Sequence, residues 1–237
     1  MKTSLHFLSA AVAAALLAGT AYANNGTVSQ LSGTLSVKKA DGSVRILSQK
    51  SEIASGDTLN TERDTFAQIR FSDGGQITLK PNTSVKIEDF KFSEEKPQDD
   101  SFLFSLVKGG LRAVTGVIGK RSRDTYRMNT ATATIGIRGT TYSADDCLTT
   151  TCIPPGASDP VEAAVYVGVS DGEVVVRNDA GEQAYQAGQF GLIGKGQRPL
   201  FLSTDPGLQF TPPASFIQSV MAGSTVNHGK TECQIRR

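Results

Sequence analysis

Residues 67–79 read AQIRFSDGGQITL, two short runs of alternating apolar and polar residues on either side of a turn. Alternation with a period of two places one face of a strand against a core and the other face in water. The Asp73-Gly74 pair between the runs suits a tight turn that needs a positive φ. The stretch therefore predicts a β-hairpin.

The same two-residue period recurs along most of the chain, in runs near residues 35–37, 85–87, 102–106, 131–137, 165–169 and 174–176. The last two runs are separated by Asp171-Gly172, which predicts a turn. Short strands with frequent turns between them are typical of an all-β barrel, sandwich or solenoid. A weak internal repeat, in which a glycine precedes a strand near positions 33, 110 and 172, favours stacked strands. We expect an all-β fold, with short strands in a two-layer roll or solenoid-like β-sandwich.

Two segments interrupt the strand pattern within residues 24–202, which we expect to form a single β domain. Residues 93–100 (SEEKPQDD) are charged and read as a solvated loop. Residues 148–160 are rich in threonine and proline, which predicts an insertion between two strands.

Residues 203–237 form a C-terminal extension in this interpretation. Pro212-Pro213 can begin a short helix and Gly223 can end it. The residues after Gly223 are mostly polar, and we expect them to form a tail.

The first 23 residues have the pattern of a secretory signal peptide. Lys2 is followed by an apolar stretch up to Leu17, and Ala21-Tyr22-Ala23 is an A-x-A cleavage site. We expect cleavage after Ala23 and export to the periplasm or the cell surface. No later run is long and apolar enough for a span, so we expect none after cleavage.

Charge and histidine content argue against several classes of function. Removal of residues 1–23 leaves 23 Lys and Arg against 23 Asp and Glu, which is unlike a nucleic-acid-binding protein. His228 is then the remaining histidine, which weakens a His-based metal site or a Ser-His-Asp triad. The glycines around Lys120 lack the spacing of a phosphate-binding loop. We therefore expect no catalytic residues, no metal, no cofactor and no nucleic-acid partner.

The three cysteines are Cys147, Cys152 and Cys233. Export permits disulfides, and the short polar segment between Cys147 and Cys152 could be closed by a bridge. Alternatively, one of these two cysteines pairs with Cys233 and fixes the tail. We favour the bridge between Cys147 and Cys152.

A basic cluster is formed by Lys120, Arg121, Arg123 and Arg127. It is a candidate interaction surface for a phosphate, an acidic partner or lipopolysaccharide. The alternative, which we favour, is a solvated hairpin tip whose charge is balanced by the acidic residues 94–100.

The segment TIGIRGTTY at residues 134–142 places Arg138 between Gly136 and Gly139, followed by Thr140. Glycines permit close approach of the backbone. A buried guanidinium could join carbonyl groups of neighbouring strands through its five donors. We expect Arg138 to be such a structural staple; the alternative is a binding site for an anion or a peptide carboxylate.

These segments resemble the FecR domain. The resemblance rests on GDTLNT at residues 56–61, the hairpin of residues 67–79, PNTSVKI at residues 81–87 and ATATIGIRGTTY at residues 131–142. One departure is Gly75, where the family commonly has Ser or Thr. The resemblance is good over residues 27–144 and looser over 164–202.

The resemblance implies an exported, mostly β, non-catalytic domain. The regulator that gives the family its name also has a cytoplasmic segment that holds a sigma factor, and a membrane span. This sequence shows neither, so we do not expect the transmembrane role to carry over.

We therefore expect a non-enzymatic protein-binding or scaffolding module whose partner is another envelope protein or a surface polymer. The alternative is a sensory or regulatory component of an iron-uptake or envelope signalling system. An enzyme is a third, weaker hypothesis.

Overall fold

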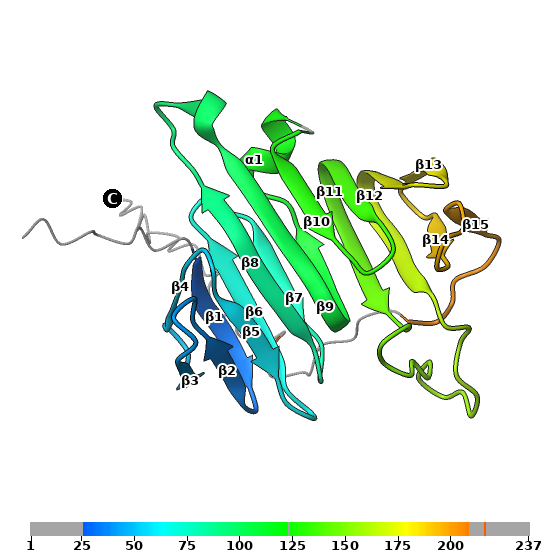
Figure 1. The fold of residues 1–237 in the computed structure, drawn as a ribbon, viewed down its shortest axis with the longest axis horizontal. Helices are drawn as coiled ribbons and strands as arrows, with labels where there is room; N and C mark the ends of the chain where they lie inside the picture. The colour runs from blue at the N-terminus through cyan, green and yellow to red at the C-terminus, as the bar shows by residue number, and fades with distance from the viewer. Residues whose placement is uncertain (1–25, 123, 209–215, 217–237) are drawn as a thin grey trace, which may run out of the picture.

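The computed structural model describes residues 26–122, 124–208 and 216 (Figure 1). The expected signal peptide, Arg123, Cys233 and the polar tail lie outside the described residues. Phe216 is described from the expected C-terminal helix, and it is buried against Phe66, with the ring centroids 6.3 Å apart.

Strands dominate the described residues. They are β1 (Gly26–Ser32), β2 (Leu35–Lys38), β3 (Val44–Leu47), β4 (Glu52–Ile53), β5 (Thr58–Thr61), β6 (Phe66–Phe71), β7 (Gln76–Leu79), β8 (Ser84–Lys91), β9 (Ser101–Val114), β10 (Tyr126–Asn129), β11 (Thr134–Asp146), β12 (Val165–Asn178), β13 (Gly181–Gln186), β14 (Phe190–Ile193) and β15 (Leu200–Leu202). A 3-10 turn (Pro97–Asp99) precedes β9, and the short helix α1 (Val117–Arg121) follows it. The all-β expectation is confirmed, and β6 and β7 form the predicted antiparallel hairpin.

Hydrogen bonds join all the strands into one sheet, which bends into two layers. The first half of β9 pairs with β8 and β10, and its second half pairs with β7 and β11. β11 and β12 divide their partners in the same way.

The first layer has the order β3-β2-β5-β8-β9-β10-β11-β12-β13. The second layer has the order β4-β1-β6-β7-β9-β11-β12-β14-β15. Figure 1 shows β1–β4 at one end of this body and β13–β15 at the other.

The core lies between the two layers, because one buried cluster draws its side chains from both. Phe71 of β6 in the second layer packs on Phe90 of β8 in the first, with the ring centroids 5.2 Å apart. Phe71 also contacts Phe102 of β9 at 4.5 Å. Deeper in the core, the hydroxyls of Tyr126 and Tyr142 are hydrogen-bonded at 2.9 Å. This aromatic packing holds the layers face to face.

A glycine in the left-handed region lies at four of the places where the chain passes from one layer to the other. These are Gly33 (φ 98°), Gly109 (φ 81°), Gly139 (φ 57°) and Gly172 (φ 78°). L-residues with a side chain rarely adopt such φ values. The sequence predicted separate short strands and a turn at residues 171–172. The structure instead has β9, β11 and β12 continuing through their glycines, because a bend in one strand preserves the ladder on both sides.

A buried threonine hydroxyl holds each bend, always at the residue after the glycine. The four bonds are Thr34 N to Thr65 Oγ1 (2.9 Å), Gly110 N to Thr83 Oγ1 (3.0 Å), Thr140 N to Thr115 Oγ1 (2.8 Å) and Thr140 Oγ1 to the Glu173 carbonyl (2.7 Å). The bends are therefore a repeated structural unit, and they fix the register of both layers.

Candidate binding site

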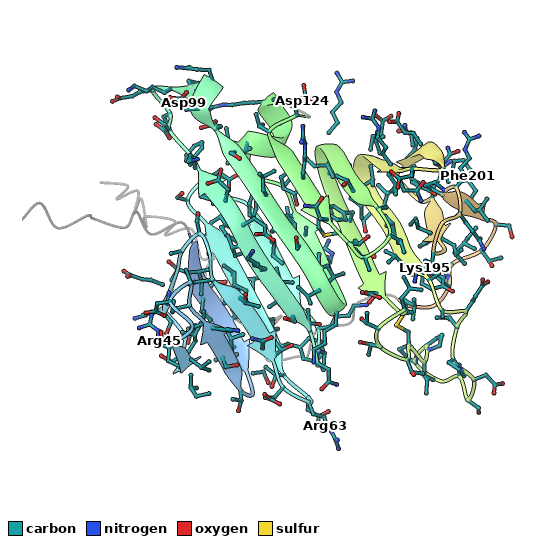
Figure 2. The ribbon with its side chains drawn as sticks, in the orientation of Figure 1. Arg45, Arg63, Asp99, Asp124, Lys195 and Phe201 are labelled. Atoms are coloured by element: carbon teal, nitrogen blue, oxygen red, sulfur yellow. A yellow bond between two sulfur atoms is a disulfide. The ribbon has the colours of Figure 1, made fainter. Side chains whose placement is uncertain are left out.

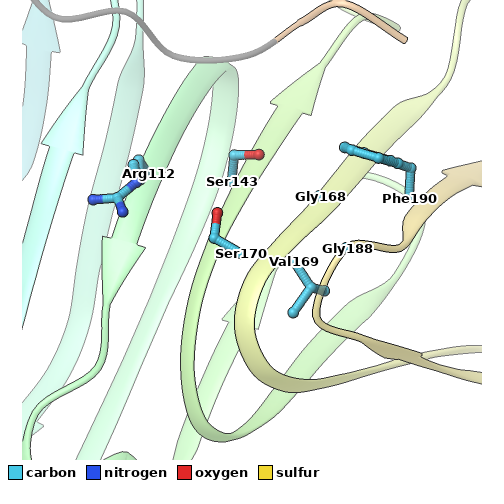
Figure 3. Close-up of a pocket in the computed structure, with 7 residues that line it drawn as sticks. All are labelled: Arg112, Ser143, Gly168, Val169, Ser170, Gly188 and Phe190. Carbon is cyan, nitrogen blue, oxygen red and sulfur yellow. The ribbon is translucent and has the colours of Figure 1, made fainter. Parts of the chain in front are cut away.

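A concavity of about 240 Å³ lies on the outer face of the second layer, toward the β14 end (Figure 3). Its lining combines one arginine, two serines, small residues and one aromatic ring: Arg112, Ser143, Gly168, Val169, Ser170, Gly188 and Phe190. Concave surfaces with an aromatic wall and a few polar groups are the usual form of ligand sites.

Strand register builds this concavity. Arg112 on β9 is opposite Ser143 on β11, Ser143 is opposite Gly168 on β12, and Gly168 is opposite Phe190 on β14. These residues form one cross-strand row, and three strand spacings make it about 14 Å long. Figure 3 shows the Ser143 hydroxyl pointing along this row toward the Phe190 ring.

Gly168 provides the space between Ser143 and Phe190. A Cβ at this position would lie 3.1 Å from Ser143 Oγ and 3.2 Å from Phe190 Cδ1. These distances are shorter than ordinary van der Waals contacts, so any larger residue would fill the floor. The Phe190 ring lies beside this gap.

Arg112 is half-buried, and within the described ranges its guanidinium has no ion-pair or hydrogen-bond partner. The hydroxyls of Ser143 and Ser170 likewise have no hydrogen bond to another described residue. An uncompensated guanidinium next to free hydroxyls can bind an anionic group, because its planar fork matches a carboxylate.

The neighbouring row explains why Arg112 lacks a partner. Asp145 accepts a bond from Lys80 Nζ at 2.6 Å, and Lys80 also donates to the Leu208 carbonyl at 2.7 Å. Burial raises the pKa of Asp145, and the Lys80 charge opposes that increase. The charges of Lys80 and Asp145 thus neutralise each other, so Asp145 does not serve as a partner for Arg112.

The disulfide between Cys147 and Cys152 is present, as predicted, with the Cα atoms 5.3 Å apart. It closes the start of the segment that joins β11 to β12. Cys147 packs with Tyr166, Leu192 and Leu208 in a small second core. The bridge therefore anchors this segment next to the outer face that carries the concavity.

The predicted basic cluster is divided by the structure. Arg121 pairs with Asp100 at 2.9 Å, and its guanidinium lies 5.6 Å from the centroid of the Phe92 ring. This pairing supports the interpretation of a charge-balanced tip. Lys120 and Arg127 are exposed. In Figure 2, Asp99 and Asp124 lie at the same edge of the molecule. An interaction surface at the cluster stays a prediction.

Asp73, from the Asp-Gly turn of the β6–β7 hairpin, positions helix α1, which carries Lys120 and Arg121. Its carboxylate accepts bonds from the Gly75 amide at 2.9 Å and the Ile118 amide at 3.3 Å. The Val117 amide donates to its carbonyl at 3.0 Å. Burial raises the pKa of Asp73, and the two amide bonds oppose that increase.

The prediction that Arg138 is a buried staple is wrong. Arg138 is exposed, because Ile135 and Ile137 occupy the core-facing positions of β11 and alternation directs Arg138 outward. Thr140 is the buried linker of this motif, since its hydroxyl donates to the Glu173 carbonyl and accepts from the Arg138 amide at 3.2 Å. Gly139 forms the bend, and Lys120 packs over it. Gly136 lies in the regular part of β11.

The sequence pattern did not indicate Arg112, Ser143 or Phe190 as candidate site residues. Alternation in GLRAV at residues 110–114 places Arg112 outward, but this is also the pattern of an ordinary solvent-facing residue. The row depends on the register of four strands that are distant in the sequence. Without strand pairing, no local signal distinguished these residues.

The described part of the chain contains no group of three or more His, Cys, Asp or Glu side chains that could hold a metal ion. None of its helices has the length and apolar character needed to cross a bilayer.

Comparison with known proteins gives a family match. The model of the family described as FecR protein matches residues 57–175. No curated protein matches the chain.

Two crystal structures of a candidate anti-sigma factor from Parabacteroides distasonis align at 13% identity, with TM-scores of 0.45 and 0.44. Each alignment covers 62% of this chain and 60% of the other. The chain thus spans less than two thirds of the length of these proteins.

Proposed function

Because this chain belongs to the FecR protein family, we propose that it is an exported, non-catalytic regulatory module of envelope signalling that responds to a bound partner. Membership of the family supports a regulatory role. Binding through the concavity on the outer face of the second layer is the finer part of the proposal.

The observation that carries the proposal is the overlap between the family match and the concavity. The match over residues 57–175 includes Arg112, Ser143, Gly168, Val169 and Ser170, whereas Gly188 and Phe190 lie beyond it. The candidate site is thus built mainly on the family's own strands. Its aromatic wall comes from the strands that follow.

The chemistry of the lining favours binding over catalysis. Its seven residues include no carboxylate, imidazole or thiol, the groups that act most often as a general base or activate a nucleophile. An arginine and two hydroxyls can recognise an anionic, polar group and hold its orientation. A scaffolding role alone would not require such a concavity.

Export is supported by the signal-peptide pattern of residues 1–23 and by the disulfide between Cys147 and Cys152. Disulfides form and persist mainly in oxidising compartments. We therefore propose the periplasm or the cell surface as its location.

Deletion of the gene in the source organism, followed by transcript profiling, tests the regulatory role. We expect a defined set of transcripts to change and to be restored by the wild-type gene. Arg112→Gln should fail to restore them. Arg70→Gln, which alters an exposed arginine on β6, is the matched control and should restore them. An unchanged transcript profile in the deletion strain would contradict the proposal.

A further inference from the structure

We propose that the Arg112 concavity binds a carboxylate-bearing sugar residue of a surface polysaccharide, with the carboxylate on Arg112 and the sugar ring against Phe190. This inference rests on the proposed function and names the ligand class for the same site. Three features of the site carry it.

The first feature is that the site lies within the sheet and away from its edges. The parts of β9, β11, β12 and β14 that form it are each paired with a strand on both sides. An extended peptide binds most readily by adding a strand to a free sheet edge. That mode is closed here, so recognition depends on side chains alone.

The second feature is the set of groups that the side chains present. Arg112 offers two parallel N–H donors to a carboxylate, and the lining contains no carboxylate that would compete. The hydroxyls of Ser143 and Ser170 can each donate and accept, which matches the hydroxyls of a sugar. The Phe190 ring supplies an apolar surface for the C–H face of a pyranose.

The third feature is that the polar row continues beyond the concavity. Arg112 is opposite Thr78 on β7, and Thr78 is opposite Gln68 on β6. Gln68 Nε2 lies 3.5 Å from Thr78 Oγ1, and Ser29 Oγ lies 2.9 Å from Gln68 Oε1. Uncharged polar side chains thus extend across the strands from the concavity. Thr78 is buried, whereas Gln68 and Ser29 are half-buried, so these two could contact further residues of a linear oligosaccharide.

Titration of the exported protein, followed by NMR of backbone amides and arginine Nε–H groups, tests the inference. The probes are an oligosaccharide of alternating glucuronic acid and N-acetylglucosamine, its carboxyl-reduced counterpart, a tetraglutamate peptide and inorganic phosphate. We expect the acidic saccharide to shift the signals of Arg112, Ser143 and Gly168. Carboxyl reduction should weaken binding by about tenfold or more, as for loss of a charged hydrogen bond.

Two variants separate the contributions of charge and shape. Arg112→Gln should weaken saccharide binding by about tenfold or more, and Arg70→Gln should leave it unchanged. Gly168→Ala keeps every charge but fills the floor between Ser143 and Phe190, so it should also weaken binding.

Each other outcome overturns the inference. Binding of tetraglutamate without the saccharide would assign the site to an acidic peptide, and equal binding of phosphate would make it a general anion site. If none of the probes binds, the proposed ligand class is wrong. In all three cases the regulatory role stands or falls separately, on the transcript profile of the deletion strain.

Discussion

Thr140→Val tests the structural unit that holds the layers together. Thr140 is buried, and its hydroxyl donates to the Glu173 carbonyl at 2.7 Å and accepts from the Arg138 amide at 3.2 Å. Valine keeps the shape of the side chain but removes both bonds. Loss of a hydrogen bond to a buried group costs about 1–3 kcal/mol.

We expect Thr140→Val to lower the free energy of unfolding by about 2 kcal/mol. For a domain of this size, that corresponds to a Tm decrease of about 4–8 °C. Arg138→Ala is the matched control, because its exposed side chain has no partner in the described ranges. Surface substitutions of this kind change stability by about 0.5 kcal/mol or less.

Urea unfolding followed by circular dichroism measures both variants against the wild type. The result that would refute the reasoning is a loss in Arg138→Ala equal to or larger than the loss in Thr140→Val. It would mean that the guanidinium is the structural link after all.

Three further predictions concern the glycine bends, the disulfide bridge and the pH dependence of stability. Gly172→Ala should destabilise by more than Gly42→Ala, measured by thermal melts, because both have a positive φ but only at Gly172 would a Cβ collide with backbone. Replacing Cys147 and Cys152 together by alanine should cost about 2 kcal/mol in urea unfolding, as expected for a loop this short; no change would contradict an ordering role. Burial raises the pKa of Asp73, so the folded protein retains protons that the unfolded chain loses above about pH 3.9. The free energy of unfolding of the wild type, relative to that of Asp73→Asn, should therefore fall as the pH rises from about 4 toward the raised pKa. A rise of this relative free energy over that interval, measured by urea titrations, would contradict the raised pKa of Asp73.

The local sequence pattern was enough to predict the strand content and the β6–β7 hairpin, because alternation of apolar and polar residues indicates directly which residues face a core. The short spacing between Cys147 and Cys152 was likewise enough for the bridge. The bends were not predictable, since a glycine that ends a strand and one that bends it have the same local sequence. Gly172 was interpreted as a turn residue, although β12 continues through it.

The candidate site depends on the pairing register of four strands, which cannot be deduced from the local sequence. Arg138 attracted attention because it lies between two glycines, yet alternation directs it to solvent. Arg112 lies in an ordinary alternating run, and only the pairing of β9, β11, β12 and β14 places it in a row with Ser143 and Phe190. The candidate site residues are thus distinguished by their neighbours in space.

Site-specific photo-crosslinking in living cells tests most directly the claim that the outer face of the second layer recognises a partner. A photoreactive residue replaces Ser170, which is exposed and lines the concavity, or Ser36, which lies on the outer face of the first layer. The account predicts a discrete adduct from position 170 that disappears with Arg112→Gln, and none from position 36. Equal adducts from both positions, or an adduct from position 170 that persists with Arg112→Gln, would contradict it.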